Sequence, residues 1–169
     1  MKRDAIHRFD TAVDLIERGL RVSIVSHLTG LHPKTLRALY RELQGRSPPS
    51  GPLPSAAAIL TTRTAQAMAS LFALCYRTVG GTGIFDQLEL QALLTAYELY
   101  RELVEALLSE ISPRNPLDIN AAWVLARDLH TGAVYFRECS HCAVQFLCAL
   151  ESLSPPDCPI CALRRRERR

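Results

Sequence analysis

Two closely spaced pairs of cysteines near the C-terminus constrain this chain more than any other feature. Cys139 and Cys142 form one C-x2-C pair, Cys158 and Cys161 form another, and 15 residues separate the two pairs. Two such pairs at this spacing are typical of a four-thiolate zinc site, in which each pair turns tightly around the metal. The spacing therefore predicts one structural Zn2+ ion held by all four cysteines. Four thiolates close such a site, so it stabilises structure and does not catalyse.

Other interpretations of the cysteines are less favoured. An iron–sulfur cluster also uses four cysteines, and the spacing alone does not separate it from zinc. A C-x2-C pair can also be a redox pair, but two pairs at this spacing favour a metal. His141, inside the first pair, is a weaker candidate ligand. Cys148 and Cys75 lie in apolar runs without a second cysteine at pair spacing, and we expect both to be buried thiols.

Composition limits the class of protein. The 169 residues are 48% hydrophobic, enough for one domain of ordinary size or a domain with a small appendix. No run approaches 18 uncharged apolar residues, which argues against a transmembrane helix, and the start "MKRDAIHRFD" lacks the apolar segment of a secretory signal. We therefore expect a cytoplasmic protein with no membrane association, in a compartment that keeps thiols reduced.

Hydrophobic periodicity predicts a mainly α fold, with a multi-helix body over residues 1–132 and a zinc-ribbon-like segment with a basic tail over 133–169. The body begins with an amphipathic stripe of apolar residues at spacings of three and four. A proline-rich connection at 47–55 interrupts it. The predicted stripe consists of Phe9, Val13, Ile16 and Leu20.

After the connection, the sequence predicts further helices and very little strand. We expect helical regions at Ala56–Val79 and from Phe85 to about Ile111, broken by "GGTG" at 80–83 and stopped by "SPRNP" at 112–116. Asp118 or Asn120 is expected to cap the next helix. "AVYF" at 133–136 is the only predicted strand, and no helix is expected in the tail.

Residues 21–44 have the order of apolar, small and turn residues that a helix-turn-helix requires. Val22, Val25 and Leu28 would line the first helix, Gly30 would make the turn, and Pro33 would begin the second helix. A helix pair with a tight turn also occurs without nucleic acid. We nevertheless favour DNA binding.

Two basic clusters support a polyanionic partner, although such runs are also found as plain solvated surface. One lies within residues 18–46, where the only acid is Glu42, and the other is the tail "RRRERR". Lysine and arginine on the outer face of the second helix can reach phosphates or guanine edges. The candidate DNA-contacting residues are Lys34, Thr35, Arg37, Arg41, Arg46, Arg164, Arg165 and Arg166.

Together these stretches resemble a known family. The run "RALYRELQGRSPPSGPLP", then "AAWVLARDL", then the two cysteine pairs and a basic tail resemble the flagellar transcriptional activator FlhC in the same order over nearly the whole chain. The resemblance implies zinc bound by Cys139, Cys142, Cys158 and Cys161. It also implies an assembly of four FlhD and two FlhC subunits that binds promoter DNA and activates flagellar and some non-flagellar operons, with RNA polymerase as a further contact.

We therefore expect a DNA-binding activator subunit without enzymatic activity. The chain has no H-E-x-x-H, no phosphate-binding glycine loop and no G-x-S-x-G. We expect a partner to cover the apolar helices, so that at least one helical stripe is exposed in the isolated chain. The alternative is a zinc-ribbon adaptor that contacts only protein, in which the helix pair is purely structural.

Overall fold

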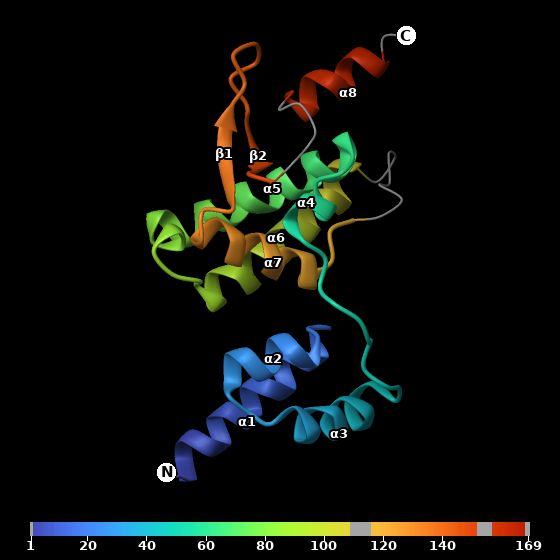
Figure 1. Ribbon diagram of the computed structural model, residues 1–169, viewed down its shortest axis with the longest axis vertical. Coiled ribbons are helices and arrows are strands. Elements are labelled where there is room, and N and C mark those ends of the chain that lie inside the picture. Colours follow the sequence, from blue (N-terminus) through green and yellow to red (C-terminus); the bar gives the residue numbers. More distant parts are fainter. Residues whose placement is uncertain (1, 109–115, 152–156, 168–169) are drawn as a thin grey trace. The chain divides into compact units, whose positions relative to one another are not determined.

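The computed structural model describes residues 2–108, 116–151 and 157–167, and the chain divides into two compact units (Figure 1). The first unit is Met1–Pro52 and the second is Leu53–Arg169. The boundary between them falls in the proline-rich connection, which contains no helix or strand. Both units are mainly helical, which confirms the predicted fold class. None of the helices in the described ranges is both long enough and apolar enough to cross a membrane.

The first unit contains three helices, whose buried faces share one small apolar core. The predicted stripe is correct at Ile16 and Leu20 but wrong at Phe9, whose side chain is 41% exposed. Phe9 and Ile6 precede the first buried residue of α1, so this end of the helix presents apolar side chains to solvent. The helices are α1 (Lys2–Glu17), α2 (Val22–Thr29) and α3 (Pro33–Gln44). Their core residues are Ala12, Leu15, Ile16, Leu20, Val22, Ile24, Val25, Leu36, Leu39 and Tyr40.

Helices α2 and α3 form the predicted helix-turn-helix pair (Figure 1). Gly30 ends α2 in the left-handed conformation, at φ 68°, and its N–H donates to the carbonyl of Ser26 at 2.9 Å. Pro33 occupies the start of α3, where no intrahelical N–H bond is lost. His32 caps the same helix, because its Nδ1 accepts from the N–H of Lys34 at 3.1 Å.

The second unit begins with a helical layer. The single helical region predicted from Ala56 to Val79 is divided, because Thr62 caps a new helix by accepting the N–H of Ala65 at 3.1 Å. The predicted break at the glycines is a 3-10 helix, and the helix expected from Phe85 begins later, at Leu90. The elements are α4 (Ala56–Ile59), α5 (Arg63–Gly80), η1 (Gly81–Phe85), α6 (Leu90–Leu108) and α7 (Ile119–His130). The predicted stop at 112–116 lies almost entirely outside the described residues.

An aromatic core joins α5 to α6, and a side-chain cap starts α7. Phe72 stacks on Tyr76 with ring centroids 6.1 Å apart and meets Tyr100 edge-on at 6.2 Å. Of the two residues proposed as caps of α7, Asp118 has this role, since its Oδ1 accepts the N–H of Ala121 at 2.7 Å. Cys75 lies in this core as predicted.

A hairpin follows α7, and here the sequence prediction was wrong in one respect. Strand β1 (Val134–Glu138) was expected, but β2 (Gln145–Ala149) was not, and the two pair antiparallel with Phe136 opposite Leu147. α5 contacts both β2 and the final helix. That final helix, α8 (Pro159–Glu167), corrects the expectation of a non-helical tail. Pro159 suits its first position, and the arginines that follow favour helix.

Candidate metal centre and basic surfaces

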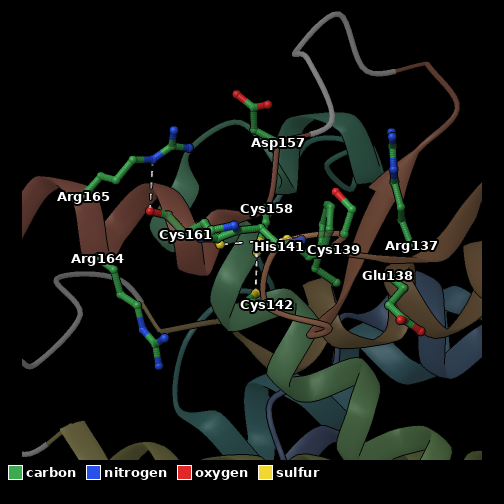
Figure 2. Close-up of a pocket in the computed structure, with 12 residues that line it drawn as sticks. Arg137, Glu138, Cys139, His141, Cys142, Asp157, Cys158, Cys161, Arg164 and Arg165 are labelled. Atoms are coloured by element: carbon green, nitrogen blue, oxygen red, sulfur yellow. Dashed lines mark hydrogen bonds between the residues drawn. The ribbon is translucent and has the colours of Figure 1, made fainter.

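The hairpin and α8 bring the four predicted cysteines together (Figure 2). Cys139 directly follows β1 and Cys142 lies in the hairpin turn, whereas Cys158 precedes α8 and Cys161 lies in its first turn. All four Sγ atoms lie within 4.8 Å of one another. The Sγ atoms of Cys139 and Cys161 are 3.8 Å apart, and those of Cys142 and Cys158 are 3.7 Å apart.

These separations fit a tetrahedral metal site. Four sulfurs bound at about 2.3 Å to one zinc ion lie about 3.8 Å from each other. A disulfide requires about 2.05 Å, and all six cysteines are free thiols. The donor set therefore fits a zinc ion closed by four sulfurs, one pair from the hairpin and one from the helix.

The first pair is shaped by a tight turn. The N–H of His141 donates to Sγ of Cys139 at 3.4 Å, and the N–H of Ala143 donates to the carbonyl of Cys139 at 2.8 Å. Ala143 has φ 57°, a left-handed conformation that no other described residue except glycine adopts. The side chain of His141 is exposed and does not join the four thiols.

Hydrogen bonds around the sulfurs set their proton affinities. Amide N–H groups of His141 and Cys142 lower the pKa of the Cys139 thiol to about 7, because they stabilise the thiolate. The pKa of the Cys161 thiol is raised to about 12, first because it forms a hydrogen bond with the side chain of Cys142 and second because it is shielded from water. Burial also raises the pKa of Cys158. A divalent metal binds the deprotonated thiolates, so its binding would release the protons of these four thiols.

A small apolar cluster surrounds the thiols. Phe146 and Cys148, on the same face of β2, are buried against Cys139 and Cys158, and Ile160 of α8 packs against them. Cys148 is 6% exposed and lies outside the group of four, in agreement with its predicted role as a buried thiol. Burial raises the pKa of the Cys148 thiol, which keeps it protonated.

Helix α5 holds both halves of the site through side chains that the sequence analysis missed. Nε2 of Gln66 donates to the carbonyl of Leu147 at 2.9 Å, and the N–H of Leu147 donates to Oγ of Ser70 at 2.9 Å. Arg63 donates from Nη1 to the carbonyl of Asp157 at 2.9 Å and lies 3.6 Å from its carboxylate. α5 therefore pairs with the edge of β2 and fixes the residue before Cys158.

Arginines line the cavity that contains the thiols, which has a volume of about 790 Å³ (Figure 2). Arg164 and Arg165 of α8 line it and are exposed, and Nε of Arg165 donates to the carbonyl of Cys161 at 3.3 Å. Arg137 of β1 also lines it, although it was not among the predicted residues. The side chain of Arg166 lies outside the described part of the chain.

The other predicted residues lie in the first unit, on α3 and, for Arg46, just after it. Leu36, Leu39 and Tyr40 form its buried face. The helical period places Lys34, Arg37 and Arg41 close together on the opposite face, because positions three and seven apart lie on one side of a helix. The predicted contact residues Lys34, Thr35, Arg37, Arg41 and Arg46 are all exposed.

Comparisons with known proteins agree on one family. The family model described as "Flagellar transcriptional activator (FlhC)" matches residues 3–169. A protein of Paraburkholderia atlantica named "Flagellar transcriptional regulator FlhC" is 34% identical over 80% of this chain and 60% of its own length. Proteins of the same name from Cupriavidus metallidurans and Erwinia tasmaniensis are 30% and 28% identical, over 84% and 94% of this chain. The chain spans 64% of the length of the Cupriavidus protein and 86% of the Erwinia protein.

Proposed function

The chain belongs to the FlhC family of flagellar transcriptional activators, and we propose that it is a zinc-carrying subunit that binds promoter DNA and activates flagellar operons. One observation carries the DNA-binding part. α3 follows a tight turn after α2, buries one apolar face, and presents a basic stripe on the other. A recognition helix requires the same arrangement, with its cations free to meet the major groove and the flanking phosphates.

The unpaired state of the basic stripe supports this proposal. Lys34, Arg37 and Arg41 form no side-chain hydrogen bond or ion pair with any described residue. Each can therefore contact a phosphate without breaking an internal bond. Arg46, just after α3, and Arg164 and Arg165 on α8 would add contacts to the DNA backbone.

In this proposal the zinc ion has a structural role. Cys139, Cys142, Cys158 and Cys161 would hold it, and the bound ion would act as a cross-link between the hairpin and α8. The chain's own residues then keep α8 in place: Arg63 holds Asp157 directly before Cys158, and Gln66 and Ser70 hold β2. No position on the metal would be left open for a substrate.

The partners are part of the same proposal. We expect the chain to work with FlhD, in an assembly of four FlhD and two FlhC subunits, and to contact RNA polymerase at the promoter. Two copies of the helix pair in one assembly would match a two-fold symmetric DNA site. Ile6 and Phe9, which are 61% and 41% exposed on α1, are apolar surface that a protein partner would cover. We expect this activity in the cytoplasm, where promoter DNA lies.

Fluorescence anisotropy with a labelled flagellar promoter duplex tests the proposal. The full chain would be titrated with and without FlhD, across a salt series. Arg37→Gln is expected to weaken binding and to reduce the slope of log affinity against log salt by about one. Arg101→Gln removes an exposed arginine of α6 and serves as the matched control. Binding that is absent, or equally salt-dependent in both variants, would favour the adaptor without DNA contact.

A further inference from the structure

A second cavity of about 520 Å³ lies in the second unit beside β1, away from the thiols. Phe85 of η1, His130 of α7 and Phe136 of β1 contribute to its walls, together with Arg77 of α5. None of the described residues that line it is acidic. The cavity is therefore an aromatic groove with a cationic side, and the family resemblance assigns no role to it.

The outer edge of β1 borders this groove and has no partner strand among the described residues. The N–H of Cys139 bonds to the carbonyl of Val144, and the N–H of Leu150 bonds to the carbonyl of Ala133. In an antiparallel pair, every second residue bonds across to the partner strand. The main-chain groups of Val134, Phe136 and Glu138 therefore point away from β2, and no described residue bonds to them.

This edge differs from the outer edge of the hairpin's other strand. Gln66 and Ser70 of α5 satisfy the main chain of Leu147 on β2. β1 has no such cover among the described residues. Unpaired N–H and C=O groups along an extended strand are a template for another extended chain.

Arg77 gives the groove its charge preference. Its guanidinium carbon lies 4.4 Å from the centroid of the Phe136 ring, so the side chain is held in place by a cation–π contact. Its N–H donors bond to no described acceptor. Phe85 meets Phe136 edge-on at 6.4 Å and is 40% exposed, as is Tyr135. An arginine that is immobilised but unpaired is suited to bind a carboxylate.

We propose that β1 and this groove bind an extended, acidic segment of a partner protein. The segment adds a strand to β1 through Val134, Phe136 and Glu138. An apolar side chain of the segment lies on Phe85 and Phe136, and a carboxylate binds Arg77. A peptide fits better than a nucleic acid, because only a peptide supplies the alternating donors and acceptors that the strand edge lacks. The inference does not depend on DNA binding by α3.

A labelled peptide tests the charge preference. The probe is fluorescein-tagged Thr-Val-Glu-Phe-Glu-Val-Thr, titrated up to about 1 mM against the full zinc-loaded chain. The matched peptide carries lysine at both glutamate positions. The acidic peptide is expected to bind roughly tenfold more tightly, since a charge-assisted pair is gained in one case and a repulsion in the other. Arg77→Gln is expected to abolish most of this preference, whereas Arg101→Gln is expected to keep it.

Hydrogen exchange tests the strand addition separately. With the acidic peptide at saturation, the amides of Val134, Phe136 and Glu138 are expected to gain protection. Those of Tyr135 and Arg137, which already bond to β2, should change little. Equal affinity for the two peptides, or protection away from β1, would overturn the proposal. Protection of the same three amides in a dimer without peptide would also overturn it, because the edge would then belong to a second copy of the chain.

Discussion

The two compact units of this chain differ in how far apart in the sequence their stabilising contacts lie. In the first unit, three consecutive helices share a core, and each turn is set by residues next to it. In the second unit, α5 holds the four-cysteine segment through bonds between residues 77, 81 and 94 positions apart. The apolar cluster of that segment is small, and most of its buried members are cysteines. We infer that local signals suffice for the first unit, whereas the C-terminal segment needs α5 and a metal.

Loss of one metal-binding thiol should produce the largest difference in stability between the two regions. Cys158→Ser is expected to abolish stoichiometric zinc, whose binding contributes on the order of 10 kcal/mol in comparable small sites. Amides of β1, β2 and α8 should then exchange freely, while those of α2 and α3 keep their protection. Zinc analysis and hydrogen exchange measure both effects. Cys148→Ala, which removes a buried thiol outside the four, should retain one zinc per chain. Full zinc retention in Cys158→Ser would contradict the assignment of the ligands.

A cavity made by mutation in the first unit should have the opposite effect, since it should destabilise that unit and leave the zinc site intact. Leu36→Ala removes a fully buried side chain from the core of α1, α2 and α3 and is expected to cost about 2–5 kcal/mol. The melting temperature of the first unit should fall while the zinc content stays unchanged. Chemical denaturation, followed by hydrogen exchange of each unit, checks this. Ala38→Ser, on the exposed face of α3, should change stability by less than about 0.5 kcal/mol. A fall in zinc content would show that the units depend on each other.

A smaller effect is expected when the contact between α5 and β2 is removed. Gln66→Ala leaves the carbonyl of Leu147 without its side-chain donor, at a cost of about 1–3 kcal/mol. Protection of β2 should fall and zinc affinity should weaken, because the hairpin places Cys139 and Cys142. Competition with a chelator and hydrogen exchange measure the two effects. Gln91→Ala, an exposed glutamine of α6, is the matched control. Unchanged zinc affinity in Gln66→Ala would mean that the thiols assemble without α5.

The smallest expected effect concerns the turn between α2 and α3. Gly30→Ala forces alanine to φ 68°, and only the end of Arg8 lies within 4 Å of the added carbon. The cost is therefore one of backbone strain, about 1–2 kcal/mol, and should lower the stability of the first unit alone. Thermal denaturation is the measurement. Gly83→Ala meets nothing within 4 Å and has no positive φ, so it should be nearly neutral. A neutral Gly30→Ala would show that this turn tolerates another conformation.

The features that the sequence predicted well are those with local chemical signals. Gly30 and Pro33 marked the helix-turn-helix, Asp118 was one of two proposed caps, and the cysteine spacing identified the four thiols that the fold brings together. The helical class and the family followed from the same kind of signal. The helix pair, the cap and each cysteine pair are marked by residues that lie close together in the sequence.

The features that were missed depend on distant partners. β2 reads as an apolar run, and only its pairing with β1 makes it a strand. Gln66 and Ser70 look like ordinary polar residues of a helix, since nothing near them in sequence points to Leu147. Arg137 was missed because it lies outside the basic clusters, and only the hairpin places it at the cavity that contains the thiols. α8 was missed because arginine runs at a chain end were interpreted by charge and not by helix propensity.

The hydrogen bonds between α5 and β2 have a practical consequence for protein engineering. Gln66 donates to the carbonyl of Leu147 and Ser70 accepts from its amide, and every residue except proline has both of these groups. These two bonds therefore do not depend on the side chain at that position, but the Leu147 side chain is itself fully buried, so a replacement must also be apolar and of similar size. A foreign hairpin with its own metal-binding turn could be grafted onto α5, provided that its backbone presents one outward N–H and C=O at the same place. α5 would then serve as a common attachment site for different hairpins.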